Sequence, residues 1–162
     1  MKILHLEDDA RDAALVRAIL DTELPGCAIT LVVTKTDFLA ALASGGHELI
    51  LSDFKLPGFS GLEALQLVCV HAPGVPFIFV SGTIGEERAI ETVQAGAADY
   101  VIKDRMMRLP VAIQRALRER EERRRRRHSE EEVHRSHATL NTIFEETADA
   151  LVVVDRQGRI TR

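Results

Sequence analysis

Short apolar segments alternate with longer amphipathic segments along the first hundred residues of the chain. The short segments are apolar almost throughout, which is typical of strands covered on both faces of a parallel sheet. The predicted strands are Lys2–Leu6, Ala28–Val33, Leu49–Ser52, Phe77–Val80 and Tyr100–Ile102.

Helical patterns fill the intervals between these strands, and Pro-Gly, Gly-Gly or single Gly residues end them. The predicted helices cover about Asp12–Leu20, Asp37–Ala43, Gly61–Val70 and Glu86–Ala95, and a fifth begins near Met106. Pro110 is compatible with the fifth helix only in its first turn. Five βα units predict an α/β fold, a doubly wound five-stranded parallel sheet with an extended C-terminal helix.

The fifth helical pattern continues beyond Leu117 without a Gly or Pro to end it. In residues 118–132, 13 of 15 side chains are charged, and Glu–Arg pairs at i,i+4 spacing stabilise a helix. We therefore expect a solvated extension. A nucleic-acid or anionic-lipid patch at Arg123–Arg127 is the weaker alternative, because acidic residues flank it on both sides. From Val133 onwards, apolar or semi-apolar residues recur at coiled-coil spacing.

Charge is distributed unevenly along the 162 residues, whose net charge is −4. Residues 1–117 carry 15 acidic and 10 basic side chains, whereas residues 118–162 carry 10 acidic and 11 basic ones. The two parts are therefore expected to have different functions. Aromatic residues are 4% of the chain and Trp is absent, which argues against a stacking platform for single-stranded nucleic acid.

The sequence contains no apolar run near the roughly 20 residues of a membrane span, and its first residues lack a signal-peptide core. We therefore expect a cytoplasmic protein without a membrane partner. Cys27 and Cys69 lie in apolar segments without metal-site spacing, and we interpret them as small buried thiols.

Acidic side chains follow two of the predicted strands. Glu7, Asp8 and Asp9 come directly after the first strand, and Asp53 follows the third. Ligands of an open parallel sheet bind beyond the carboxyl ends of its strands, which lie about 4.8 Å apart. Carboxylate oxygens without Cys or His suit Mg²⁺. The sequence therefore predicts a Mg²⁺ site at this edge.

Ser81 and Lys103 follow the fourth and fifth strands. A hydroxyl and an ammonium beside a metal suit the oxygens of a phosphoryl group. The set permits phosphoryl transfer to Asp53, with Lys103 and the metal neutralising charge and Ser81 donating a hydrogen bond. Each residue type alone is common on surfaces and in caps, so the prediction depends on their joint placement at strand ends.

Four stretches resemble, in order, the receiver domain of bacterial response regulators. They are ILHLEDD, LILSDFKLPGFSGLEAL, FIFVSG and QAGAADYVIK, at residues 3–9, 49–65, 77–82 and 94–103. The resemblance implies a flavodoxin-like receiver fold and a phosphoryl group supplied by a partner histidine kinase or phosphotransfer protein. The sequence has no nucleotide-binding loop, so any catalysis by the chain is of its own phosphorylation and dephosphorylation.

The resemblance also implies roles for individual residues. Asp53 would be the phosphoacceptor; Asp8, Glu7, Asp53 and the Lys55 backbone carbonyl the Mg²⁺ ligands; Lys103 the phosphate contact; and Ser81 and Tyr100 the switch pair. The face of the fourth helix, fifth strand and fifth helix commonly pairs in the family. A homodimer through this face and the C-terminal helix is therefore expected.

Two residues depart from the family pattern. Asp104 follows Lys103, where family members commonly have a proline whose cis peptide bond orients the lysine. We expect a trans bond here, because a cis bond before a non-proline residue costs about 3 kcal/mol. Lys55 occupies the position two residues after the phosphoacceptor. In the family, the side chain at this position governs access of the hydrolytic water, so we expect Lys55 to alter the lifetime of the phosphoryl group.

Residues 140–162 resemble the start of a PAS sensory domain, and residues 150–161 have a hairpin pattern. A hairpin alone is marginally stable. The predicted organisation is a receiver domain over 1–120, a charged helical linker or coiled coil over 121–146, and a truncated PAS-like start over 147–162, with an output region beyond.

Other interpretations stay open at this point. A degenerate receiver would act as a phosphorylation-independent dimerisation or interaction module. A phosphatase of the haloacid-dehalogenase type would need an aspartate at the position of Lys55. His5 is predicted to be a hydrogen-bonded core side chain, and His134 and His137 are predicted to be solvated rather than metal ligands.

Overall fold

The computed structural model describes residues 1–82 and 92–146, and for residues 133–146 it describes only the helical backbone. Contacts divide the chain into two units, residues 1–121 and residues 122–162. The sheet and the candidate site belong to the first unit. The limits of the three predicted domains stay a prediction.

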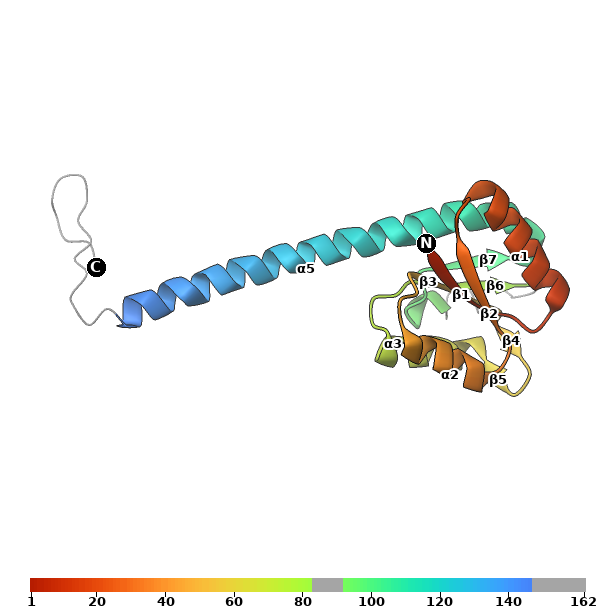
Figure 1. Ribbon diagram of the computed structural model, residues 1–162, viewed down its shortest axis with the longest axis horizontal. Coiled ribbons are helices and arrows are strands. Elements are labelled where there is room, and N and C mark those ends of the chain that lie inside the picture. The colour runs from red at the N-terminus through yellow and green to blue at the C-terminus, as the bar shows by residue number, and fades with distance from the viewer. Residues whose placement is uncertain (83–91, 147–162) are drawn as a thin grey trace. The chain divides into compact units, whose positions relative to one another are not determined.

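Five parallel strands form the sheet in the order β2-β1-β3-β6-β7 (Figure 1). The strands are β1 (Lys2–Leu6), β2 (Ala28–Val32), β3 (Leu49–Ser52), β6 (Phe77–Ser81) and β7 (Asp99–Ile102). The predicted doubly wound α/β fold is confirmed, and no strand end differs from its prediction by more than one residue.

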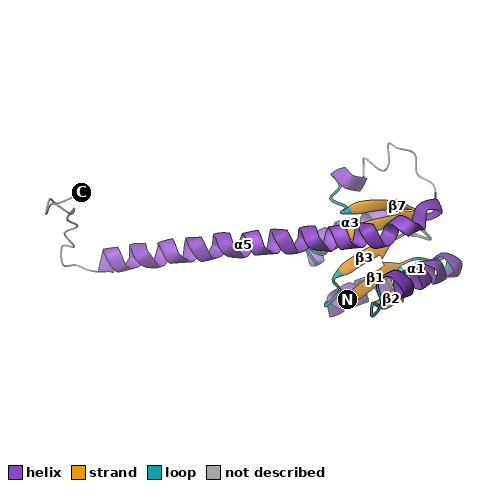
Figure 2. Ribbon diagram, turned by 90° about the horizontal axis from the view of Figure 1, so that it is seen from above, coloured by secondary structure: helices purple, strands orange, loops and turns teal. Residues whose placement is uncertain are grey.

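Helices cover both faces of this sheet. They are α1 (Ala10–Glu23), α2 (Lys35–Ser44), α3 (Gly61–His71) and α5 (Leu109–Glu146). Helices α1 and α5 share a buried cluster with Ile3 of β1, whereas α2 and α3 share another with Leu4, the next residue of that strand. Successive side chains of a strand point to opposite faces, so β1 supplies both cores. Figure 2 distinguishes the strands, in orange, from the helices, in purple.

Helices α1 and α2 begin two residues earlier than predicted. The carboxylate of Asp9 accepts hydrogen bonds from the backbone N–H groups of Arg11 and Asp12, and the Thr34 side chain accepts one from Asp37. These capping bonds satisfy N–H groups that a helix start leaves unpaired, and so extend both helices toward their N-termini.

A short hairpin between β3 and α3 is absent from the sequence prediction. Strands β4 (Lys55–Leu56) and β5 (Phe59–Ser60) pair antiparallel around a turn in which Gly58 has a φ of +69°. Ser60 then caps α3 reciprocally with Glu63. The hairpin therefore connects the segment after Asp53 directly to the start of a helix.

The C-terminal helix is continuous, as predicted, but begins three residues later than Met106. A 3-10 segment, η1 (Lys103–Arg108), precedes it, and Arg105 there has non-helical angles. Pro110 is the second residue of α5, within the first turn as predicted. Every residue from 121 to 132 is exposed, which confirms a solvated charged extension. Coiled-coil pairing stays a prediction.

Two predicted elements fall on residues that the structure does not fully describe. For the predicted helix Glu86–Ala95, residues 92–94 are helical and the residues from 83 to 91 lie outside the description. The hairpin predicted within residues 150–161 also lies outside it. Among the described helices, none combines the length and apolar character needed to cross a membrane.

Candidate functional site

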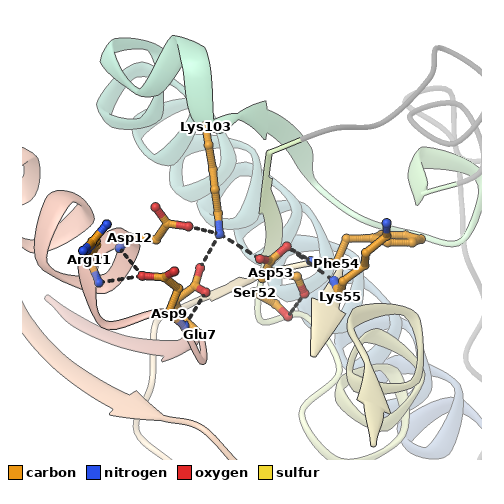
Figure 3. Close-up of polar contacts among 9 residues, drawn as sticks. All are labelled: Glu7, Asp9, Arg11, Asp12, Ser52, Asp53, Phe54, Lys55 and Lys103. Atoms are coloured by element: carbon orange, nitrogen blue, oxygen red, sulfur yellow. Dashed lines mark hydrogen bonds and ion pairs between the residues drawn. The ribbon is translucent and has the colours of Figure 1, made fainter. Parts of the chain in front are cut away.

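The predicted site residues stand at the carboxyl ends of four strands. Glu7 follows β1, Asp53 follows β3, Ser81 ends β6 and Lys103 follows β7. Parallel strands end at a common edge, so residues distant in sequence meet there. Figure 3 shows Glu7, Asp53 and Lys103 converging on one point.

Three carboxylates form an acidic cluster at this edge. One oxygen each from Glu7, Asp8 and Asp53 lies within 4.8 Å of the others. Glu7 is buried and Asp8 is exposed, so the cluster opens to solvent on one side. An all-oxygen donor set that leaves positions for water fits Mg²⁺. Lys55 lies at the start of β4 with an exposed side chain, and a ligand role for its carbonyl stays a prediction.

Asp53 is held through both its side chain and its main chain. Its Oδ1 accepts a hydrogen bond from the Phe54 N–H, and its Oδ2 accepts one from Lys103 Nζ at 2.7 Å. The Ser52 hydroxyl donates to the Asp53 backbone carbonyl at 2.7 Å. A Cβ atom on Gly61 would overlap that carbonyl oxygen. The position of Asp53 therefore depends on a glycine at the start of α3.

Lys103 contacts three carboxylates. Its Nζ lies 2.5 Å from Asp12 Oδ2, 2.7 Å from Asp53 Oδ2 and 2.9 Å from Glu7 Oε2. Burial by itself lowers the pKa of Lys103, but these three partners raise it above its ordinary value. The ammonium is therefore charged at neutral pH. The peptide bonds of the described residues are all trans, including that between Lys103 and Asp104, as predicted.

Glu7 connects the acidic cluster to the start of α1. Its Oε1 accepts a hydrogen bond from the Asp9 N–H at 3.0 Å, while its Oε2 faces Lys103. Burial raises the pKa of Glu7, and the contacts with Lys103 and the Asp9 N–H oppose that rise. Without a metal, the Glu7 carboxyl therefore holds a proton more tightly than a solvated one.

Ser81 and Tyr100 lie on neighbouring strands. Ser81 is 4% exposed, and the Tyr100 hydroxyl is buried. Burial raises the pKa of Tyr100, and the Ser81 hydroxyl opposes this rise in pKa. The structure thus brings the two predicted switch residues together, with Ser81 on the strand next to the one that Asp53 follows.

Sequence reasoning missed Asp12, was wrong about the bonding of His5, and was wrong about the burial of Cys69, whose thiol is free but exposed. Asp12 stands in the first turn of α1, four residues after Asp8, and an acidic residue so close to the acidic triplet is the signal that would have found it. His5 is buried as predicted, but within the described residues neither ring nitrogen has a hydrogen-bond partner. Burial lowers the pKa of His5 to about 4, so the ring is neutral at pH 7.

A doubly wound five-stranded sheet with an acidic cluster and a lysine at its carboxyl edge defines a receiver-type α/β domain. The sequence profile of the family described as the response regulator receiver domain matches residues 3–114. The chain belongs to this family, whose domains act in two-component signalling.

Curated relatives carry the same similarity. The chain is 34% identical over 103 residues to the response regulator protein FleR of Pseudomonas aeruginosa, covering 63% of this chain and 21% of the relative. It is 35% identical over 115 residues to the regulatory protein LuxO of Vibrio vulnificus, covering 70% and 25%. The chain thus spans about a fifth to a quarter of the length of these relatives.

Solved structures share the fold. A CheY-like receiver domain protein from Methanospirillum hungatei is 29% identical with a TM-score of 0.67, covering 75% of this chain and 97% of that one. The receiver domain of the Pseudomonas aeruginosa sensor histidine kinase PA1611 is 24% identical with a TM-score of 0.62, covering 72% and 96%. The latter structure has a magnesium ion coordinated in its active-site cleft.

Proposed function

We propose that this chain is a phosphorylation-dependent switch, in which Asp53 accepts a phosphoryl group from a partner histidine kinase or phosphotransfer protein. The observation that carries the proposal is the bond between Lys103 and Asp53 beside the acidic cluster. A carboxylate that attacks an anionic phosphoryl group needs cations to neutralise its oxygens.

The transfer forms an acyl phosphate. A carboxylate oxygen of Asp53 attacks the phosphorus atom of the donor phosphohistidine. The O–P bond forms as the P–N bond breaks, and the imidazole leaves with the bonding electrons and then takes up a proton. Hydrolysis later returns the Asp53 carboxylate and inorganic phosphate. Lys103 already donates to Asp53, so its charge lies beside the transferred oxygens.

Glu7, Asp8 and Asp53, with the Lys55 carbonyl, are the proposed Mg²⁺ ligands. When bound, Mg²⁺ supplies positive charge that offsets the repulsion between these carboxylates and the incoming phosphoryl oxygens. Support comes from the all-oxygen donor set and from the magnesium in the PA1611 receiver structure.

Signal output is proposed to pass from Ser81 and Tyr100 to α5. A change at the Ser81 hydroxyl would alter the packing of the neighbouring Tyr100. Helix α5 runs without a break from the first unit into the charged segment, and would carry the change toward a PAS-like or other output region.

We propose a cytoplasmic homodimer that pairs through the fourth-helix, β7 and α5 face and the C-terminal helix. Light scattering with and without phosphodonor tests the dimer.

Intact-mass measurement tests the central proposal. The protein is incubated with Mg²⁺ and phosphoramidate, a small-molecule phosphodonor. We expect one phosphoryl adduct, which is lost when Mg²⁺ is chelated and absent from Asp53→Asn. Asp21→Asn, which alters an exposed aspartate of α1, is the matched control and keeps the adduct.

The alternative function is a phosphorylation-independent dimerisation or interaction module. Its outcome in the same experiment is distinct, because a folded protein with no adduct on Asp53 under any donor condition supports it and rejects the switch. A dimer that forms equally with and without phosphodonor would point the same way.

A further inference from the structure

We propose that Asp12 is a positioning residue for Lys103, holding the ammonium beside Asp53. The consequence for phosphoryl transfer rests on the proposed function, whereas the positioning itself does not. Asp12 stands in the first turn of α1, 91 residues before Lys103.

The geometry places Asp12 apart from the acidic cluster. Asp12 Oδ2 lies 2.5 Å from Lys103 Nζ, and Figure 3 shows Asp12 and Asp53 on opposite sides of the ammonium. The Asp12 side chain is 31% exposed, against 0% for Glu7. Asp12 therefore approaches Lys103 from the solvent side, while the two buried-side partners belong to the cluster.

The start of α1 fixes the position of Asp12. The Asp9 carboxylate accepts hydrogen bonds from the backbone N–H groups of Arg11 at 2.7 Å and Asp12 at 3.3 Å. Glu7 in turn accepts from the Asp9 N–H. A capped first turn has little backbone freedom, so the Asp12 carboxylate is presented from a rigid point.

Lys103 needs a partner of this kind. Glu7 and Asp53 are proposed metal ligands, so their oxygens are shared between the metal and the ammonium. Asp12 is not a proposed metal ligand, so its contact with Lys103 does not depend on whether the metal is bound. The residue after Lys103 is Asp104, without the fixed φ of a proline, so the side-chain contact supplies the constraint.

Asp12 also brings a negative charge near an anionic phosphoryl group, which by itself would slow transfer. Asp12 lies on the opposite side of the ammonium from Asp53 (Figure 3), so its charge is farther from the phosphoryl group than the charge of Lys103, and its repulsion is the weaker of the two effects. The positioning effect therefore exceeds the repulsion, and removal of Asp12 slows transfer.

Nitrogen-15 NMR of the Lys103 ammonium tests the positioning in the metal-free protein. We expect slowly exchanging Nζ hydrogens in the wild type and exchange faster by on the order of tenfold in Asp12→Ala, because a hydrogen-bonded acceptor is lost. Asp12→Asn keeps an oxygen acceptor and lies between the two. Asp21→Ala, in the same helix, leaves the signal unchanged. An unchanged Lys103 signal in Asp12→Ala overturns the proposal, whether or not Asp53 is ever phosphorylated.

A double-mutant cycle tests the consequence for transfer. Asp12→Ala is expected to slow phosphorylation of Asp53 by phosphoramidate on the order of tenfold, because the reacting groups are less well oriented. In a Lys103→Met background, whose fold is checked by circular dichroism, Asp12→Ala adds no further slowing. Faster phosphorylation of Asp12→Ala, or an equal loss in both backgrounds, overturns the proposal.

Discussion

Two regions of this chain are dense in charged side chains, and they differ in what those side chains contact. At the carboxyl edge of the sheet, Lys103 Nζ lies within 2.9 Å of three carboxylates, and its side chain is 13% exposed. In the charged part of α5, His128 and Glu132 are 3.9 Å apart with side chains 75% and 72% exposed.

The difference in solvent access changes what each charge contributes. An exposed ion pair contributes about 0 to 1 kcal/mol, since water and salt screen it. A poorly solvated charge depends on its partners, and removing one partner leaves the others desolvated and unpaired. Acidic and basic side chains therefore form a tightly coupled site at the sheet edge and a solvated surface in α5.

The largest effect is expected from Lys103→Met in the metal-free protein. This change leaves Glu7 buried without its cation and lets the carboxylates of the site repel one another, so we expect the free energy of unfolding to fall by about 3 kcal/mol. Urea unfolding at neutral pH measures it. Added Mg²⁺ should recover part of the loss. Lys55→Met, at an exposed lysine, is the control, and equal midpoints for the two variants would contradict the coupling.

A somewhat smaller loss is expected from Gly61→Ala, which tests how tightly the site is packed. The added Cβ atom would overlap the Asp53 carbonyl oxygen and lie 2.8 Å from Phe79 Cε1. Overpacking of this kind costs about 2 kcal/mol. At Gly82 the nearest atom to an added Cβ is Lys103 Cδ at 4.0 Å, so Gly82→Ala is the control. If both variants unfold at the wild-type urea concentration, the packing argument is wrong.

The strands of the fold were predictable because each is covered on both faces and is therefore apolar along its whole length. The hairpin of β4 and β5 was not, since strands of two residues are too short to show any periodicity. The starts of α1 and α2 were placed late because the capping residues Asp9 and Thr34 are polar and lie outside the amphipathic pattern.

The site was predictable to the extent that strand ends define it. Glu7 and Asp53 directly follow strands, and Asp8 is the residue after Glu7. The sheet brings the oxygens of these three carboxylates together. Asp12 was missed because an acidic residue in a first helical turn already has a local explanation, the helix dipole. Its partner Lys103 is distant in sequence, so the contact becomes evident only in the folded chain.

Glu7→Gln is expected to stabilise the metal-free protein at neutral pH, by less than Lys103→Met destabilises it. The pKa of Glu7 is raised above its ordinary 4.5, mainly by burial. The folded state therefore binds the proton more tightly than the unfolded state, and stability falls as pH rises through the window from 4.5 to the raised value. Glutamine resembles the protonated form and avoids that loss.

The pH dependence distinguishes this cause from a general gain in packing. Well below pH 4.5 the carboxyl is protonated in both states, so the advantage of Glu7→Gln should disappear there. Urea unfolding at acidic and neutral pH, with a chelator present, measures the difference. An advantage that persists unchanged in acid would show that burial of the charge is not its source.

The smallest effect is expected in the exposed part of α5, from Glu132→Gln. The pair with His128 is exposed on both sides, so its removal should change the free energy of unfolding by less than about 0.5 kcal/mol, with little dependence on salt. Circular dichroism and urea unfolding of the full chain measure it. A loss of more than about 1 kcal/mol would break the comparison, because an exposed pair does not contribute that much. It would mean that the charged segment is covered in solution, and the dependence of the loss on protein concentration would then show whether a second copy of the chain covers it.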